Sequence, residues 1–311
     1  MNDKMSGMAG RERELLTYLG GVGSAAVAFS GGVDSTYLLA AAAGALGADH
    51  VTALTAVSPV FPVREKAEAG DFCKEHGIRQ IFVMFDPFTL PEFADNPPDR
   101  CYLCKKALFT KLAAEAERLG AKVLMEGTNK DDEGDYRPGL RAIAELGVAS
   151  PLRKAGLTKA EIYALSKERG LPTAKKPSFA CLATRIPYGE KITAKKLRSI
   201  EGAERILAEK GFYQFRVRTR GTSAGAPNAA ACGGAEPAED AAAGGILTAR
   251  IEVRTEEIGR FADAALREEI VRAFRSLGYT YVSLDLAGYR TGSMNEMLPE
   301  AAAAAALYGK G

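Results

Sequence analysis

The sequence is poor in histidine, and its cysteines are few and odd in number. Only His50 and His76 occur among 311 residues, and neither lies near the Cys101/Cys104 pair. Without a nearby histidine or a second Cys-x-x-Cys pair, nothing completes a four-ligand structural zinc site. The chain has five cysteines, and an odd number argues against a framework of structural disulfides. Metal or redox chemistry is therefore the expected use of these thiols.

The chain also lacks a strong charge excess and long hydrophobic runs. Its 41 Lys and Arg residues nearly balance 39 Asp and Glu residues, which leaves a net charge of +2. This balance argues against general binding to nucleic acid or to a membrane surface, and is still compatible with a local basic groove. The longest apolar runs, 38–46 and 301–307, are too short to span a bilayer, and residues 1–10 lack the apolar core of a signal peptide. We expect a cytoplasmic protein without nucleic-acid or membrane partners.

One short stretch has the composition of a phosphate-binding turn. The apolar run 25–29 leads into Ser30-Gly31-Gly32-Val33-Asp34-Ser35, and an apolar segment of helical character, 36–46, follows. Adjacent glycines allow positive φ and a close approach of the backbone to a ligand. The N–H groups of such a turn and of the helix start bind phosphate. Ser30 and Ser35 add hydroxyl donors, and we expect Asp34 or Ser35 to cap the helix.

The hexapeptide differs from two common nucleotide-binding motifs. It lacks the Gly-Lys-Ser/Thr ending of a Walker A loop, and it is not Gly-x-Gly-x-x-Gly. It resembles the PP-loop of the ATP pyrophosphatases, which cleave ATP to AMP and pyrophosphate. The other interpretation of Gly31 and Gly32 is an ordinary tight turn between a strand and a helix.

Strand and helix patterns alternate through residue 132. Strands are predicted over 25–29, 50–57, 78–85 and 122–125, separated by helices over 36–46, 62–76 and 99–119. This order predicts an α/β fold with a doubly wound parallel sheet, in which ligands bind at the carboxyl ends of the strands. The PP-loop and Gly127-Thr128-Asn129 both follow strands, so we expect them to line one ATP-binding cleft. The acids that either help to hold magnesium on ATP or form a solvated loop are Asp131, Asp132 and Asp135.

A composition change near residue 192 predicts a second, smaller domain. We therefore divide the chain into a nucleotide-binding domain, 1–191, and an α+β domain for substrate binding or oligomerisation, 192–311. Its predicted helices are 193–210 and 255–278, and its predicted strands are 212–220, 246–253 and 279–286. Residues 221–245, rich in Ala, Gly, Pro and acids, predict a disordered insertion that contains Cys232.

Arginines occupy one face of the predicted strand 212–220. Alternation places Arg216, Arg218 and Arg220 on the face opposite Phe215 and Val217. Guanidinium groups pair well with phosphate or carboxylate, so this face suits a bound anion. A solvated sheet face is the other interpretation.

Three cysteines combine into a candidate cluster site. Cys101 and Cys104 are three residues apart and share one face of the predicted helix. A Cys-x-x-Cys pair alone is compatible with zinc, a redox dithiol or an iron–sulfur cluster. With Cys181 as a third thiolate, the set suits a 4Fe-4S cluster that has one open iron. The cations expected to lower the pKa of these thiols are Lys105, Lys106 and Arg185. Cys73, on a predicted helix, is expected to be a core residue.

Six stretches taken together resemble one family. In chain order they are the PP-loop, 101–105, Glu126-Gly-Thr-Asn129, 177–185, Phe215-Arg-Val-Arg218 and 289–295. The chain closely resembles the LarE-type sulfur transferases over nearly its whole length, apart from 221–245. These enzymes act in making the nickel-pincer nucleotide cofactor of lactate racemase.

The resemblance implies a two-step reaction on a small-molecule nucleotide. ATP, with magnesium, adenylates a carboxylate of pyridinium-3,5-biscarboxylic acid mononucleotide, and sulfur then replaces AMP. It implies catalytic and cluster-ligand roles for Cys101, Cys104 and Cys181, and a homo-oligomer with a possible sulfide donor protein. The phosphate of the substrate would lie on Arg216 and Arg218, with Arg185 as a further substrate-binding residue.

Other functions remain open. Within the same family, one subgroup sacrifices the sulfur of the cysteine that matches Cys181, leaving dehydroalanine. Other PP-loop enzymes include tRNA thiolases, which should carry a basic RNA-binding module, and amide-forming ligases, which need an amidotransferase domain. A nucleotide sensor or cluster-binding scaffold would bind ATP without turnover.

Overall fold

The computed structural model describes residues 2–134, 138–177, 180–222, 245–290 and 292–294. These residues form two compact units. One comprises 2–93 and 98–181, and the other 94–97 and 182–294, within the described ranges. The sequence-based boundary near residue 192 lies inside the second unit, and the extent of each functional domain stays a prediction. Within the described ranges, no helix is both long enough and apolar enough to cross a membrane.

The first unit is built on a four-stranded parallel sheet. Its strands are β1 (Ala25–Ala28), β2 (Val51–Val57), β3 (Arg79–Met84) and β4 (Val123–Met125), in the order β3-β2-β1-β4. Ala25 pairs with Val51 of β2 on one side and with Val123 of β4 on the other. Small and β-branched residues predominate in the two central strands β1 and β2, which helices cover on both faces.

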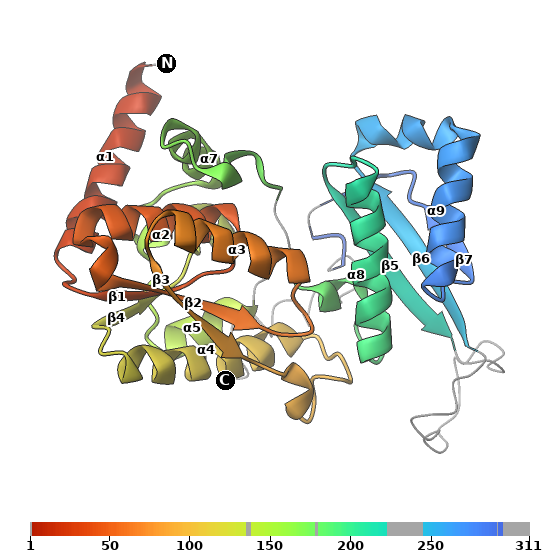
Figure 1. The fold of residues 1–311 in the computed structure, drawn as a ribbon, viewed down its shortest axis with the longest axis horizontal. Helices are drawn as coiled ribbons and strands as arrows, with labels where there is room; N and C mark the ends of the chain where they lie inside the picture. The colour runs from red at the N-terminus through yellow and green to blue at the C-terminus, as the bar shows by residue number, and fades with distance from the viewer. Residues whose placement is uncertain (1, 135–137, 178–179, 223–244, 291, 295–311) are drawn as a thin grey trace. The chain divides into compact units, whose positions relative to one another are not determined.

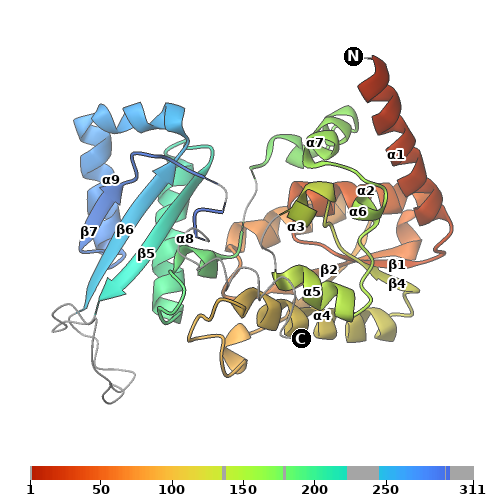
Figure 2. The same cartoon turned by 180° about the vertical axis from the view of Figure 1, so that it is seen from behind.

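Helices lie on both faces of this sheet (Figures 1 and 2). Val27 of β1 packs with α1 (Asn2–Gly20), α2 (Val33–Leu46) and α3 (Val63–Glu75) in one core, whereas Ala26 packs with α4 (Arg100–Arg118) and α5 (Pro138–Glu145) in another. The short helices α6 (Pro151–Lys154) and α7 (Lys159–Glu168) join the first core. The predicted doubly wound α/β fold is therefore confirmed.

The strand order places a topological switch point between β1 and β4. The chain moves outward from β1 to β2 and β3, and α4 then carries it across the other face to β4. Helices leave β1 and β4 on opposite faces, so the carboxyl ends of these two strands border a crevice. The PP-loop follows β1, and Gly127-Thr128-Asn129 follows β4.

The second unit contains a three-stranded mixed sheet with helices on one face (Figure 1). Its strands are β5 (Phe215–Thr222), β6 (Ile246–Val253) and β7 (Tyr281–Leu284), with β5 antiparallel and β7 parallel to β6. Alternate residues of β5, Phe215 and Val217, pack with α8 (Ala194–Glu209) and α9 (Ala264–Ser276). The predicted α+β arrangement is confirmed, with the arginines of β5 on the opposite face.

Two predicted boundaries in this unit are wrong. Gly221 and Thr222 belong to β5, where they pair with Leu247 and Ile246, so the predicted insertion does not begin at residue 221; residues 223–244, including Cys232, lie outside the described ranges. The long helix predicted over 255–278 is interrupted at Asp263. Its carboxylate accepts hydrogen bonds from the backbone N–H groups of residues 265 and 266, which starts α9 as a separate helix.

A substitution at Gly127 tests how closely the PP-loop and the loop after β4 pack together at the switch point. A Cβ atom at Gly127 would lie 3.0 Å from the Ser35 nitrogen and 3.2 Å from the Asp34 carbonyl carbon, both backbone atoms. Gly127→Ala should therefore lower the free energy of unfolding by about 1–3 kcal/mol. The control Gly44→Ala, in α2 with nothing within 4 Å, should raise it by up to about 1 kcal/mol. Urea unfolding of both variants checks this, and a Gly127→Ala protein as stable as the wild type would contradict it.

Candidate functional site

Hydroxyl groups and one left-handed glycine shape the PP-loop. Gly31 has φ +73°, and the Ser30 and Ser35 hydroxyl oxygens lie 3.1 Å apart. The Gly32 N–H donates to the Ser30 hydroxyl over 3.4 Å, and the Ser35 hydroxyl donates to the Gly32 carbonyl over 3.1 Å. The loop is thus folded back on the start of α2, as a phosphate-binding turn requires.

The predicted cap of α2 is wrong. Gly32 is the N-cap residue, and no side chain caps the helix. Ser35 lies in the first turn and instead bonds back to Gly32, while Asp34 points to another partner, Lys159. Among the described residues, only the Ser30 hydroxyl contacts the N-cap N–H, over 3.4 Å, and no side chain caps the first turn of α2, which suits an external anion at this position.

Asp34 connects the PP-loop with the loop that follows β4. It forms an ion pair with Lys159 at the start of α7, and its other carboxylate oxygen accepts from the Asn129 amide over 3.4 Å. Burial raises the pKa of Asp34, the charge and hydrogen bond of Lys159 lower it, and the nearby Asp132 carboxylate raises it further. Two carboxylates and one ammonium thus share this corner of the first unit.

A buried glutamate, Glu126, holds the loop after β4 through hydrogen bonds. The Glu126 carboxylate accepts the Thr128 N–H over 3.1 Å and the Thr128 hydroxyl over 2.7 Å, and it also accepts the Ser150 hydroxyl. Glu126 was not among the predicted site residues, although a carboxylate at the end of a predicted strand and two residues before a threonine is a signal for such a contact. The Thr128 hydroxyl is therefore directed to Glu126.

The acids predicted to hold magnesium shape this loop. The Asn129 N–H donates to Asp132 over 2.9 Å, and the Lys159 N–H donates to Asp131 over 2.8 Å. Asp135 lies outside the described ranges. Across the residues that the structure describes, no three His, Cys, Asp or Glu side chains are grouped so that they could hold a metal ion by themselves.

The three predicted cluster cysteines all lie in the first unit. Cys101 and Cys104 are on α4, and Cys181 lies after α7, as the last residue of the range 98–181. Burial, together with the charges of Cys181 and Cys101, raises the pKa of the Cys104 thiol to about 12. The thiols therefore lie close enough to interact. Cys73 is buried in the hydrophobic core, as expected.

The prediction that neighbouring cations lower the thiol pKa is wrong for Cys104. Lys105 and Arg100 do lower its pKa, but burial outweighs them. Lys106 instead bonds to Glu145 and Tyr102, and Arg185 bonds to Glu204. The cation beside the pair that sequence reasoning missed is Arg100, which is 2% exposed and lies 3.9 Å from the Cys101 sulfur.

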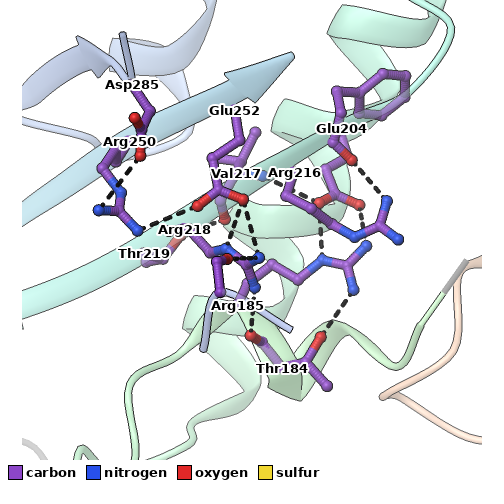
Figure 3. Close-up of polar contacts among 12 residues, drawn as sticks. Thr184, Arg185, Glu204, Arg216, Val217, Arg218, Thr219, Arg250, Glu252 and Asp285 are labelled. Carbon is purple, nitrogen blue, oxygen red and sulfur yellow. Dashed lines mark hydrogen bonds and ion pairs between the residues drawn. The ribbon is translucent and has the colours of Figure 1, made fainter. Parts of the chain in front are cut away.

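The second unit gathers the three arginines that the sequence predicts to bind substrate (Figure 3). Arg185 is fully buried and forms a bidentate pair with Glu204, over 2.8 and 2.9 Å. Arg218 pairs with Glu252 over 3.0 Å and donates to the Ser293 hydroxyl over 2.8 Å. The predicted alternation of β5 is thus confirmed. At Arg216 and Arg218 this face is buried or half-buried and cross-linked, and Arg220 is exposed.

Arg216 lies between these two ion pairs, and its charged guanidinium is buried. It is 4% exposed, donates to the Phe215 carbonyl over 2.7 Å, and its guanidinium lies 5.0 Å from the Tyr289 ring centroid. Burial, together with the charge of Arg185, lowers the pKa of Arg216 to about 10. An anion bound here would reduce that electrostatic cost. Arg220, at the end of the row, is exposed.

Glu204 holds this arginine cluster together. Burial alone raises its pKa, but the charge and hydrogen bonds of Arg185, the charge of Arg216 and the Val217 N–H together lower it below the ordinary value. Because the folded-state pKa is lowered, the stabilisation is present above the ordinary glutamate pKa, and it is lost as pH falls through the folded-state value.

Glu204→Gln should lower the free energy of unfolding at neutral pH by about 3–5 kcal/mol, because it leaves buried guanidinium charges uncompensated. The difference from wild type should shrink as pH falls below about 4.3, where the unfolded glutamate is protonated. Urea unfolding across this range measures it. Glu209→Gln, an exposed change on the same helix, is the control and should leave stability unchanged. A pH-independent difference would contradict this assignment.

Known proteins similar to this chain support one family. No family model matches the chain. An uncharacterized protein of Synechocystis is 36% identical over 284 residues, which cover 91% of this chain and 96% of that protein. The pyridinium-3,5-bisthiocarboxylic acid mononucleotide synthase of Lactiplantibacillus plantarum is 33% identical over 96% of this chain and 98% of its own length. A glutamine-hydrolyzing GMP synthase component of Thermoplasma volcanium is 30% identical over 60% of this chain and 64% of its own length. From the two relatives that match along their whole length, and from the PP-loop at the switch point of a parallel sheet, we conclude that the chain belongs to the LarE-like family of PP-loop ATP pyrophosphatases.

Proposed function

We propose that this protein is an ATP-dependent thiocarboxylate synthase acting on pyridinium-3,5-biscarboxylic acid mononucleotide. A carboxylate oxygen of the substrate bonds to the α-phosphorus of ATP, and pyrophosphate leaves. A sulfur nucleophile then bonds to the acyl carbon, and AMP leaves with the former carboxylate oxygen. The observation that carries the proposal is the 33% identity to the bisthiocarboxylic acid mononucleotide synthase along 96% of this chain.

The PP-loop and the loop after β4 would hold the ATP phosphates. The proposed ATP-binding set is Ser30, Gly31, Gly32, Ser35, Gly127, Thr128 and Asn129. Both donors of Thr128 bond to Glu126, so Thr128 would shape the loop rather than bond to a phosphate. Asp34, with Asp132 beside it, would carry magnesium, because this ion is commonly bound by one or two carboxylates together with substrate phosphates and water. Lys159 balances Asp34 in the structure as it stands.

Arg216 and Arg218 would bind the phosphate of the nucleotide substrate. The support is the charge of their cluster, in which Arg185, Arg216, Arg218 and Arg250 face Glu204, Glu252 and Asp285. Arg185 is fully buried against Glu204, so it would act in substrate binding by holding the arginine cluster in position through Glu204.

Cys101, Cys104 and Cys181 would supply the sulfur. Three thiols that lie close enough to interact are suitable ligands for a 4Fe-4S cluster with one open iron. In the described part of the chain they are not arranged as a metal site before a cluster binds. Such a cluster, when bound, would carry the sulfide that replaces AMP. In the alternative, Cys181 gives up its own sulfur and becomes dehydroalanine. A homo-oligomer, a sulfide donor protein and a role in maturing lactate racemase stay predictions from the family resemblance.

A different PP-loop adenylating enzyme is the second candidate. The likeness to a GMP synthase component favours it, but that likeness covers only 60% of the chain. A nucleotide sensor would share the ATP site and lack turnover.

Substrate-dependent pyrophosphate release separates these functions. Adding pyridinium-3,5-biscarboxylic acid mononucleotide should stimulate pyrophosphate release from ATP, because adenylation needs its carboxylate. Asp34→Asn should reduce this rate at least about tenfold by weakening magnesium binding. The exposed change Asp49→Asn is the matched control. Pyrophosphate release at the same rate with and without the mononucleotide substrate would exclude the synthase function.

Iron analysis and mass spectrometry identify the sulfur source. Anaerobic reconstitution should give about four iron and four sulfide per chain. Cys101→Ala should lose both the iron and repeated turnover, whereas Cys73→Ala, a change in the hydrophobic core, should keep them. Cys181 should keep its mass after turnover. Loss of one hydrogen sulfide from Cys181 would establish the sacrificial route instead. Full repeated turnover by Cys101→Ala would contradict the three-cysteine cluster.

A further inference from the structure

Lys176 connects the cysteine-bearing segment to the PP-loop. Its ammonium donates to the Gly31 carbonyl over 3.0 Å and to the Glu65 carboxylate over 2.6 Å, and it also pairs with Glu68. An ammonium has three donors, and these three acceptors use them all. The side chain is 12% exposed, so the contact is enclosed rather than a surface ion pair.

The acceptor on the PP-loop is a residue whose orientation matters for phosphate binding. Gly31 has positive φ, and its carbonyl belongs to the same peptide as the Gly32 N–H at the start of α2. In a trans peptide the carbonyl and the N–H point in opposite directions. A cation that holds the Gly31 carbonyl on one side therefore fixes the direction of the Gly32 N–H on the other.

Glu65, the partner of Lys176 on α3, is a buried carboxylate. Glu65 is 9% exposed, and its backbone carbonyl would lie 3.2 Å from a Cβ atom at Gly31, so α3 and the PP-loop are in close contact. Burial raises the pKa of Glu65, and the hydrogen bond and charge of Lys176 lower it. On the other side, the Lys176 carbonyl accepts the Tyr163 hydroxyl of α7 over 2.8 Å.

We propose that Lys176 is a positioning residue for ATP: it clamps the Gly31–Gly32 peptide in its phosphate-binding orientation. Cys181 follows Lys176 by five positions in the sequence. A chain of that length reaches at most about 18 Å. The lysine that holds the proposed nucleotide-binding loop is therefore close in the chain to the thiol. The inference rests on the proposed function only in that the PP-loop binds ATP.

Comparing stability with ATP affinity tests the clamp. Lys176→Met should lower the melting temperature, because the buried Glu65 keeps only the more distant Arg64, at 3.8 Å, as a cation. It should also weaken binding of the magnesium complex of α,β-methylene-ATP about tenfold by calorimetry. The double variant Glu65→Gln/Lys176→Met removes both charges, so it should recover the melting temperature and still bind the nucleotide weakly. The control Lys74→Met, on the exposed side of α3, should match the wild type in both.

Two outcomes would overturn the clamp. One is wild-type nucleotide affinity in Lys176→Met. The other is an affinity that recovers with the melting temperature in the double variant, since that would show a purely structural ion pair. Because the assay measures nucleotide binding alone, a wild-type protein that binds the nucleotide but forms no thiocarboxylate would refute the proposed function and leave the clamp standing.

Discussion

The close approach of two loops at the β1/β4 switch point is the constraint on which the nucleotide site depends. Gly127 lies against the backbone of Asp34 and Ser35, where no larger residue fits without a shift. This contact brings the PP-loop into reach of Asn129, whose amide bonds to Asp34. It is available only because α4 carries the chain across the sheet, so that β4 becomes the neighbour of β1. The sheet topology thus places the loop that would surround the ATP phosphates.

Buried charge is the second organising feature, and it is used differently in the two units. In the first unit, cations compensate buried or half-buried carboxylates beside the PP-loop: Lys159 pairs with Asp34, and Lys176 and Arg64 pair with Glu65. In the second unit, carboxylates compensate buried arginines. Ion pairs of this kind add little net stability, but removing one partner is costly, so they fix the orientation of side chains. Both arrangements suit the recognition of phosphate groups at defined positions.

The cysteine site shows burial outweighing charge. Arg100 and Lys105 both favour the Cys104 thiolate, yet burial holds its pKa well above the ordinary value. Counting nearby cations along the sequence therefore misjudged this thiol. A bound metal cluster would change the balance, because metal ligation deprotonates a thiol directly. Cys104 consequently has the electrostatics of a buried thiol in the structure.

The sequence alone determined the fold class, the PP-loop, the polar face of β5 and the family resemblance, because strand and helix periods, adjacent glycines and short motifs are local properties of a chain. Only the tertiary structure decided which charges meet. The partners of Asp34, Arg185 and Lys176 are Lys159, Glu204 and Glu65, all distant in the sequence or on other elements. The break at Asp263 and the missing cap on α2 likewise depended on which hydrogen bonds formed after packing. Burial sets both the pKa of a group and the cost of leaving it unpaired, and burial exists only once the chain is folded.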